Sequence, residues 1–222
     1  MIRLAGVTRT FPGPRPRTVL SGVSLDVAKG ELVAILGESG VGKSTLLNLV
    51  AGLDVPDAGQ VSVAGHTFAD MDDDALTVFR RRHIGFVFQA FHVLPYLTVA
   101  QNVALPLALL DVRDPDARVH AMLAAVGLAD RGASLPRELS GGELQRTAIA
   151  RALVHAPDVV LADEPTGNLD PESAGVVMTL LRDQLHAHGA TGVMVTHSRA
   201  AARMADRVYT LSAAGLAPTV LA

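Results

Sequence analysis

The stretch that decides the fold runs from Leu32 to Thr45 and reads LVAILGESGVGKST. Leu32 to Leu36 are all apolar and predict a buried β-strand. The residues after them match the pattern G-x-x-x-x-G-K-[ST], and Thr45 to Val50 then predict the body of a helix. A strand, a glycine-rich loop and a helix in this order indicate a phosphate-binding loop.

The order of these elements has a physical reason. A helix N-terminus carries unpaired N–H groups and a partial positive charge, which both favour an anion. The Lys43 ammonium is a compact charge that can reach outer phosphates, and the Ser44 hydroxyl is placed to bind Mg²⁺. The candidate phosphate-binding residues are therefore Gly37, Glu38, Ser39, Gly40, Val41, Gly42, Lys43, Ser44 and Thr45.

A pair of acidic residues follows a second apolar stretch. Val159 to Ala162 predict another buried strand, and Asp163 and Glu164 come directly after it. Ligands of open α/β sheets bind at the carboxyl ends of the strands, where these carboxylates would lie. Asp163 is placed to hold Mg²⁺ that bridges nucleotide phosphates, and Glu164 can approach an attacking water.

The bulk properties restrict the class of protein. The chain has 222 residues, a formal net charge of −3 and no cysteine. One α/β domain with an inserted lobe fits this length, and a disulfide framework or a Cys-ligated metal is excluded. The longest apolar candidate, Val103 to Leu110, is too short to cross a bilayer and contains Pro106, so we expect no membrane span. Because basic residues are scattered, apart from 80–82, we expect no nucleic-acid partner.

Strand and helix patterns alternate along the chain, which predicts a mostly parallel sheet. Helical patterns alone fill the middle, so we expect a core of residues 1–89 and 157–222 interrupted by a helical lobe of residues 90–156. Strand patterns cover 2–7, 23–27, 32–36, 61–63, 84–88, 159–162, 191–195 and 208–211, and the longer helical patterns cover 99–110, 116–126, 141–155 and 171–188.

Further motifs in the right order show that the chain resembles the ATP-binding subunits of ABC transporters over nearly its whole length. The resemblance implies an ABC-type P-loop NTPase core with an N-terminal antiparallel β portion and an inserted helical subdomain. The matching segments are Leu139 to Arg146 (signature motif), Val159 to Pro165 (Walker B), Thr166 to Asp170 (D-loop), His197 (switch histidine), Gln89 (Q-loop) and Phe11, which stands where the family has an adenine-stacking aromatic.

The resemblance also implies roles for these residues. ATP and Mg²⁺ are the expected ligands, with Ser44, Gln89 and Asp163 on the metal, Glu164 activating water and His197 stabilising the γ-phosphate. In the family, two subunits sandwich two ATP molecules head to tail, so we expect a homodimer on ATP binding. The residues expected to complete the site of the opposite subunit are Ser140, Gly141 and Gly142, and Asp170 of the D-loop is a further candidate nucleotide-binding residue.

Several of these residues also have a purely structural interpretation. Ser140 and Glu143 have the spacing of a capping box, and Asp170 before Pro171 is a good N-cap. Two glycines inside the box weaken a helix start, which favours a second anion site at Gly141 and Gly142. The apolar residues between Phe91 and Val99 fit either a binding surface for a permease or the core of the lobe.

The function implied is an ATPase that powers separate transmembrane permease subunits. FVFQ at 86–89 and the residues that follow are similar to the subfamily for lipoprotein release, macrolide efflux and peptide efflux. Glu38, Gln101 and Phe11 depart from the usual residues and leave the subgroup open. Export of a lipoprotein, peptide or hydrophobic compound is expected, from a cytoplasmic position on the inner face of the membrane. A cell-division ATPase that regulates a membrane partner without moving cargo is the alternative.

Overall fold

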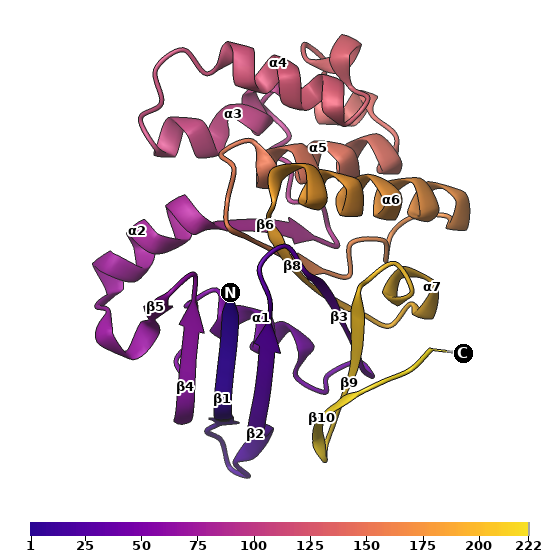
Figure 1. Cartoon of the computed structure of the whole chain (residues 1–222). Coiled ribbons are helices and arrows are strands. Elements are labelled where there is room, and N and C mark those ends of the chain that lie inside the picture. Colours follow the sequence, from indigo (N-terminus) through magenta and orange to yellow (C-terminus); the bar gives the residue numbers. More distant parts are fainter. Residues whose placement is uncertain (222) are drawn as a thin grey trace.

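The computed structural model describes residues 1–221 and contains two β-sheets with helices packed on them (Figure 1). The first sheet is antiparallel and has the strand order β2-β1-β4-β5. In it, β1 and β2 make a long hairpin whose register shifts several times along its length. The strands are β1 (Ile2–Phe11), β2 (Arg17–Val27), β4 (Ala58–Val63) and β5 (His66–Thr67).

The second sheet is six-stranded, with the order β10-β9-β3-β8-β7-β6. Strands β6, β7, β8, β3 and β9 run parallel, and β10 is antiparallel to β9. Parallel pairing brings the carboxyl ends of β3, β7 and β8 to one edge, where ligands bind in open α/β sheets. The strands are β3 (Leu32–Leu36), β6 (Ile84–Phe88), β7 (Val159–Asp163), β8 (Thr191–Thr196), β9 (Arg207–Ser212) and β10 (Gly215–Pro218).

Helices cover both faces of the parallel sheet. Because strand side chains alternate, Val33 and Ile35 of β3 join the core shared with α1 and the antiparallel sheet, while Ala34 joins the core shared with α3 to α6. Figure 1 shows α3 and α4 stacked above α5 and α6. The helices are α1 (Lys43–Val50), α2 (Asp73–His83), α3 (Val99–Leu109), α4 (Asp116–Ala125), α5 (Gly141–Leu153), α6 (Pro171–His188) and α7 (Arg199–Ala202).

The expected fold class is confirmed, with local differences. Strand β2 begins at Arg17 rather than at residue 23, because pairing with β1 outweighs the low strand propensity of Gly22. Helix α1 begins at Lys43, inside the loop motif. The short elements β5, β10 and α7 carry too little periodicity to predict from sequence. The division into residues 1–89, 90–156 and 157–222 stays a prediction.

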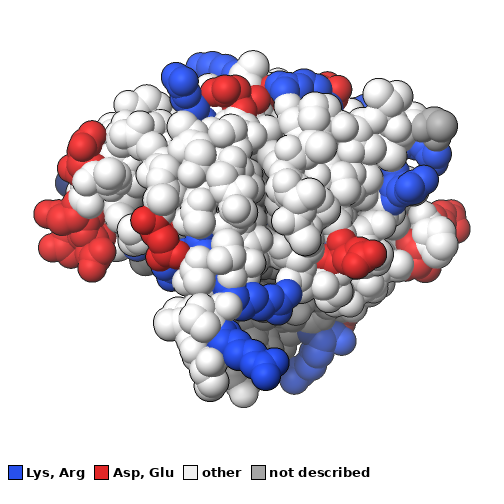
Figure 2. Space-filling view, turned by 90° about the horizontal axis from the view of Figure 1, so that it is seen from below, with Lys and Arg blue, Asp and Glu red and all other residues white. Residues whose placement is uncertain are grey.

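The apolar character of the helices and the distribution of surface charge both concern possible binding partners. None of the helices within residues 1–221 combines the length and the apolar character that crossing a bilayer demands. On the face seen from below in Figure 2, charged side chains lie at the edges and across the lower part of the view, and the broad area above them carries no charge.

Candidate functional site

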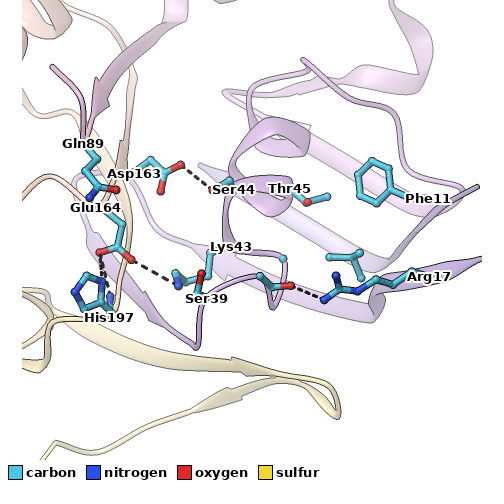
Figure 3. Close-up of a pocket in the computed structure, with 13 residues that line it drawn as sticks. Phe11, Arg17, Ser39, Lys43, Ser44, Thr45, Gln89, Asp163, Glu164 and His197 are labelled. Carbon is cyan, nitrogen blue, oxygen red and sulfur yellow. Dashed lines mark hydrogen bonds and ion pairs between the residues drawn. The ribbon is translucent and has the colours of Figure 1, made fainter. Parts of the chain in front are cut away.

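A cavity of about 890 Å³ opens at the carboxyl ends of β3, β7 and β8. Most residues singled out from the sequence for catalysis and for metal binding line it. The phosphate-binding loop supplies one wall and the β1–β2 hairpin another, as Figure 3 shows. The lining residues are Phe11, Arg17, Val19, Ser39, Gly40, Gly42, Lys43, Ser44, Thr45, Gln89, Asp163, Glu164 and His197.

The loop can wrap around the cavity because glycine stands where its backbone turns most sharply. Gly42 is the N-cap of α1 with φ 113°, and a Cβ there would lie 2.5 Å from Cγ1 of Val19. The side chain of Lys43 folds back, and its Nζ donates to the carbonyl oxygens of Gly37 at 2.7 Å and Glu38 at 3.1 Å. Three other residues of the loop do not line this cavity: Gly37, Glu38 and Val41.

Glu164 lies at the centre of a small charged cluster. Its Oε1 is 3.6 Å from Nζ of Lys43, and its Oε2 accepts the backbone N–H of His197 at 3.1 Å. Nδ1 of His197 is 3.0 Å from the same Oε2. The backbone of Glu164 has φ 46°, a conformation that non-glycine residues rarely adopt and that is found at functional sites. This turn after β7 aims the carboxylate into the cavity, as the sequence predicted.

Oxygen ligands suited to Mg²⁺ converge next to this cluster. The Ser44 hydroxyl donates to Oδ2 of Asp163 at 2.8 Å. Gln89 reaches the same cavity, and its Nε2 donates to Oδ1 of Asn168 at 3.3 Å, which leaves its amide oxygen as an acceptor. Residues 1–221 contain no cluster of three His, Cys or acidic side chains that would hold a metal alone. The set fits Mg²⁺, which binds through one or two protein oxygens together with substrate phosphates and water.

The signature segment does not reach this cavity in its own chain. Ser140 caps α5, with its hydroxyl accepting the N–H of Glu143 at 3.3 Å and donating to that carboxylate at 2.8 Å. Hydrogen bonds from the Ser140 backbone and hydroxyl lower the pKa of Glu143. The capping box is therefore present, and Ser140 is exposed while Gly141 and Gly142 are half-buried.

Asp170 likewise lies outside the cavity, at the N-cap of α6. Its carboxylate accepts the N–H groups of Glu172 at 3.1 Å and of Ser173 at 3.0 Å. Hydrogen bonds from Ser173 hold the pKa of Asp170 below its usual value. The structural role foreseen for this residue is present, and its place at an exposed turn leaves it accessible to a second subunit.

Sequence reasoning missed Arg17 and Val19, and it left Asn168 without a role. Arg17 and Val19 enter the cavity from β2, and Asn168 also donates to the backbone oxygen of Gln89 at 2.9 Å. The sequence held one signal for Arg17, which is its place at the start of β2, because β2 pairs with β1 and β1 ends at Phe11. Phe11 lines the cavity with its side chain partly exposed, at the end remote from Glu164 (Figure 3).

Comparison with known proteins places this geometry in a family. The ABC transporter family matches residues 20–167. The lipoprotein-releasing system ATP-binding protein LolD of Chromohalobacter salexigens is 49% identical over 215 residues, which are 95% of this chain and 90% of that protein. The macrolide export ATP-binding/permease protein MacB 1 of Yersinia pestis bv. Antiqua is 46% identical over 94% of this chain, and the match covers 32% of that longer protein.

Solved structures agree with the sequence comparison. The ATP-binding cassette MJ0796, solved as a dimer bound to ADP and Pi, superposes with a TM-score of 0.86 at 40% identity and covers 96% of this chain and 94% of its own. A second dimeric structure of MJ0796, described as a bacterial ABC transporter cassette, has a TM-score of 0.84 at 41% identity, with the same coverage of both chains.

The chain belongs to the ABC transporter family. Within that family it is the ATP-binding subunit, an ATPase that acts on ATP with Mg²⁺.

Proposed function

We propose that this chain is the motor of a membrane exporter and that two copies close around two ATP molecules. One observation carries the proposal: residues 1–221 have two glycine-bearing helix N-termini, at Lys43 and at Gly141, and of these two the one at Lys43 opens on the cavity. A phosphate bound at Lys43 is thus left open to solvent on one side within a single copy. The exposed Ser140 and the glycines after it, supplied by a second copy, complete that side.

The proposed hydrolysis follows from the positions of the charged groups. The loop residues that line the cavity, Ser39, Gly40 and Gly42 to Thr45, bind the phosphates. Ser44, Asp163 and Gln89 would hold Mg²⁺, which would spread the negative charge of the phosphates. Glu164 takes a proton from water as the water attacks the γ-phosphorus, and the bond to the bridging oxygen of ADP breaks. His197 stabilises the γ-phosphate.

Two opposite charges of the site face each other. Lys43 and Glu164 lie 3.6 Å apart with side chains that are 9% and 12% exposed. ATP offers Lys43 a more highly charged partner, so we expect the ammonium to turn to the phosphates and to release Glu164. The carboxylate then stays tied to His197, which holds it at the position where water attacks. Loss of the γ-phosphate after hydrolysis removes the contact that joins the two copies.

A second hollow is suited to the permease. A groove of about 380 Å³ lies between β6 and helices α3 and α5, and its apolar lining includes Phe88 and Leu109. Arg151 fixes the segment after Gln89 at this groove by donating to the carbonyl oxygens of His92 at 2.6 Å and Phe91 at 3.0 Å. A permease segment bound there would touch the element that carries Gln89. We propose this groove as the permease site, where β6 meets a helical subdomain of residues 90–156.

The relatives' names indicate the cargo class. Proteins of lipoprotein release and of macrolide export are similar to this chain over almost all of it. We propose export or extraction of a lipoprotein or other hydrophobic compound, from the cytoplasmic side of the membrane, with the chain held there by its permease.

The permease groove is tested by reconstitution with a permease partner. Leu109→Glu in the groove should lower the ratio of the ATPase activity with the permease to that without it. An unchanged ratio places the permease elsewhere.

The dimer is tested by a charge at the second helix terminus. A Cβ at Gly142 meets only Ser173, at 3.7 Å, so an aspartate fits within its own chain. In the dimer, however, Gly142→Asp sets a carboxylate against the phosphates held by the other copy. We expect dimerisation with ATP and hydrolysis to be lost while monomeric ATP binding persists. Gly175→Asp, on an exposed face of α6 with nothing near its Cβ, is the matched control. Hydrolysis at the parent rate in Gly142→Asp contradicts the proposal.

A further inference from the structure

The β1–β2 hairpin brings an arginine beside the aromatic residue of the cavity. Phe11 and Arg17 are directly paired in the antiparallel ladder, so their side chains leave the hairpin on the same face. Both line the cavity, and Figure 3 shows them together at the end opposite Glu164 and His197. If the adenine stacks on Phe11, the group next to it, the ribose with its phosphate, lies by Arg17.

Arg17 is held in place by the phosphate-binding loop itself. Its Nη2 donates to the backbone oxygen of Gly40 at 2.8 Å. A guanidinium has five N–H donors, so this bond leaves others directed at the cavity. The contact spans from β2 to the tip of the loop and sets the guanidinium between the aromatic end and the phosphate end of the site.

The other basic groups nearby are already engaged. The Arg9 guanidinium lies 5.2 Å from the centroid of the Phe11 ring and is bound by Asp54 at 2.7 Å and Asp57 at 2.9 Å. Lys43 lies at the far end with Glu164. Arg17 and Lys43 are the only Lys or Arg side chains that line the cavity within the described residues, one at each end.

We propose that Arg17 is a nucleotide-binding residue whose guanidinium donates to the phosphate nearest the ribose. It is a second cation for the triphosphate and acts at the end remote from Lys43. The proposal rests on the proposed placement of the nucleotide, with its base on Phe11 and its outer phosphates at Lys43. A planar fork suits a phosphate bound by two parallel hydrogen bonds, which gives Arg17 an advantage over a lysine at the same position.

The test compares Arg17→Ala, Arg17→Lys and Arg17→Gln by titration with ATP, ADP and adenosine, with ligand-observed NMR for the weak ligand adenosine. We expect Arg17→Ala to raise the Kd of ATP and of ADP about tenfold, the size of one charge-assisted contact at a partly open site, and to leave adenosine unchanged. Arg17→Lys restores most of the affinity because it keeps the charge. Arg17→Gln, which keeps only a neutral donor for Gly40, does not.

The control is Arg15→Ala, in the turn just before β2, where the side chain is exposed, does not line the cavity and has no hydrogen bond or ion pair to residues 1–221. An equal loss of affinity for adenosine and for ADP in Arg17→Ala overturns the proposal, because Arg17 would then only support binding of the base. Rescue by Arg17→Gln as complete as by Arg17→Lys overturns it too, since loop support would suffice. If Lys43→Ala also binds ATP normally, the placement of the nucleotide itself is wrong, which separates the two failures.

Discussion

Glu164→Gln should bind ATP more tightly than the parent and fail to turn it over. The carboxylate is the group that faces Lys43, with Oε1 at 3.6 Å from Nζ. Glutamine has nearly the same shape, and its amide oxygen can still accept the N–H of His197. The substitution therefore removes a charge and a proton acceptor while it leaves the turn after β7 intact.

The size of the effect on binding follows from the distance between the charges. At 3.6 Å and an effective dielectric constant of about 20, the two groups attract by about 4 to 5 kcal/mol. Desolvation offsets most of this attraction, and ion pairs near a surface are worth at most about 1 kcal/mol net. Freed from that competition, ATP should bind roughly fivefold more tightly. Loss of a general base lowers hydrolysis by about 10² to 10⁴-fold.

The assay measures the Kd of Mg·ATP by titration, single-turnover hydrolysis, and the dimer fraction by size-exclusion chromatography. We expect tight binding, a stalled reaction and an ATP-bound dimer. Asp183→Asn is the matched control, because within residues 1–221 that exposed carboxylate on α6 pairs only with the neighbouring Arg182. Hydrolysis at the parent rate would exclude Glu164 as the base, and a weaker Kd would refute the competition between the carboxylate and the phosphates.

Three further predictions concern other parts of the site and fold. Lys43→Ala should abolish high-affinity ATP binding, and undiminished binding in a titration refutes that role. Gly167→Ala places a Cβ 2.7 Å from Nε2 of Gln89, so it should displace that side chain and lower kcat with little change in Tm; unchanged kcat would show that Gln89 has room to adapt. Burial lowers the pKa of His155 in the folded protein. The neutral side chain therefore contributes its full stabilisation above the pKa of the unfolded chain, about 6.5, and this stabilisation is lost as the pH falls below that pKa. His155→Leu should therefore reduce the drop in unfolding free energy between about pH 7 and pH 5 in urea titrations, and an unaltered drop contradicts the assignment.

The phosphate-binding loop and the acidic strand end could be predicted because their chemistry is encoded in short contiguous spacing. Lys43, Ser44, Asp163 and Glu164 all lie where the pattern put them. Parallel pairing then brings together segments that are far apart in the sequence, and a mostly parallel sheet could be predicted from the alternating strand and helix patterns, whereas the strand order came from the structure.

Arg17 and the Gln89–Asn168 contact could not be predicted in the same way. The pairing of Arg17 with Phe11 depends on register shifts in β1 and β2, and no local pattern specifies them. The double contact between Gln89 and Asn168 joins residues from two loops that meet only in the folded chain. Ser140 shows a different limit, since the sequence indicated both capping and anion binding, and a single copy displays only the capping.

The central claim, that each ATP site is completed by the second copy, is tested most directly by mixing two inactive variants. Lys43→Ala keeps an intact signature segment, and Gly142→Asp keeps an intact phosphate-binding loop. A mixed dimer then contains one complete site, made from the loop of one copy and the signature segment of the other. We expect a 1:1 mixture to recover ATPase activity, up to about a quarter of the parent value for random pairing, although each variant alone is inactive. A mixture as inactive as its components would show that each copy uses its own signature segment, and would contradict the account.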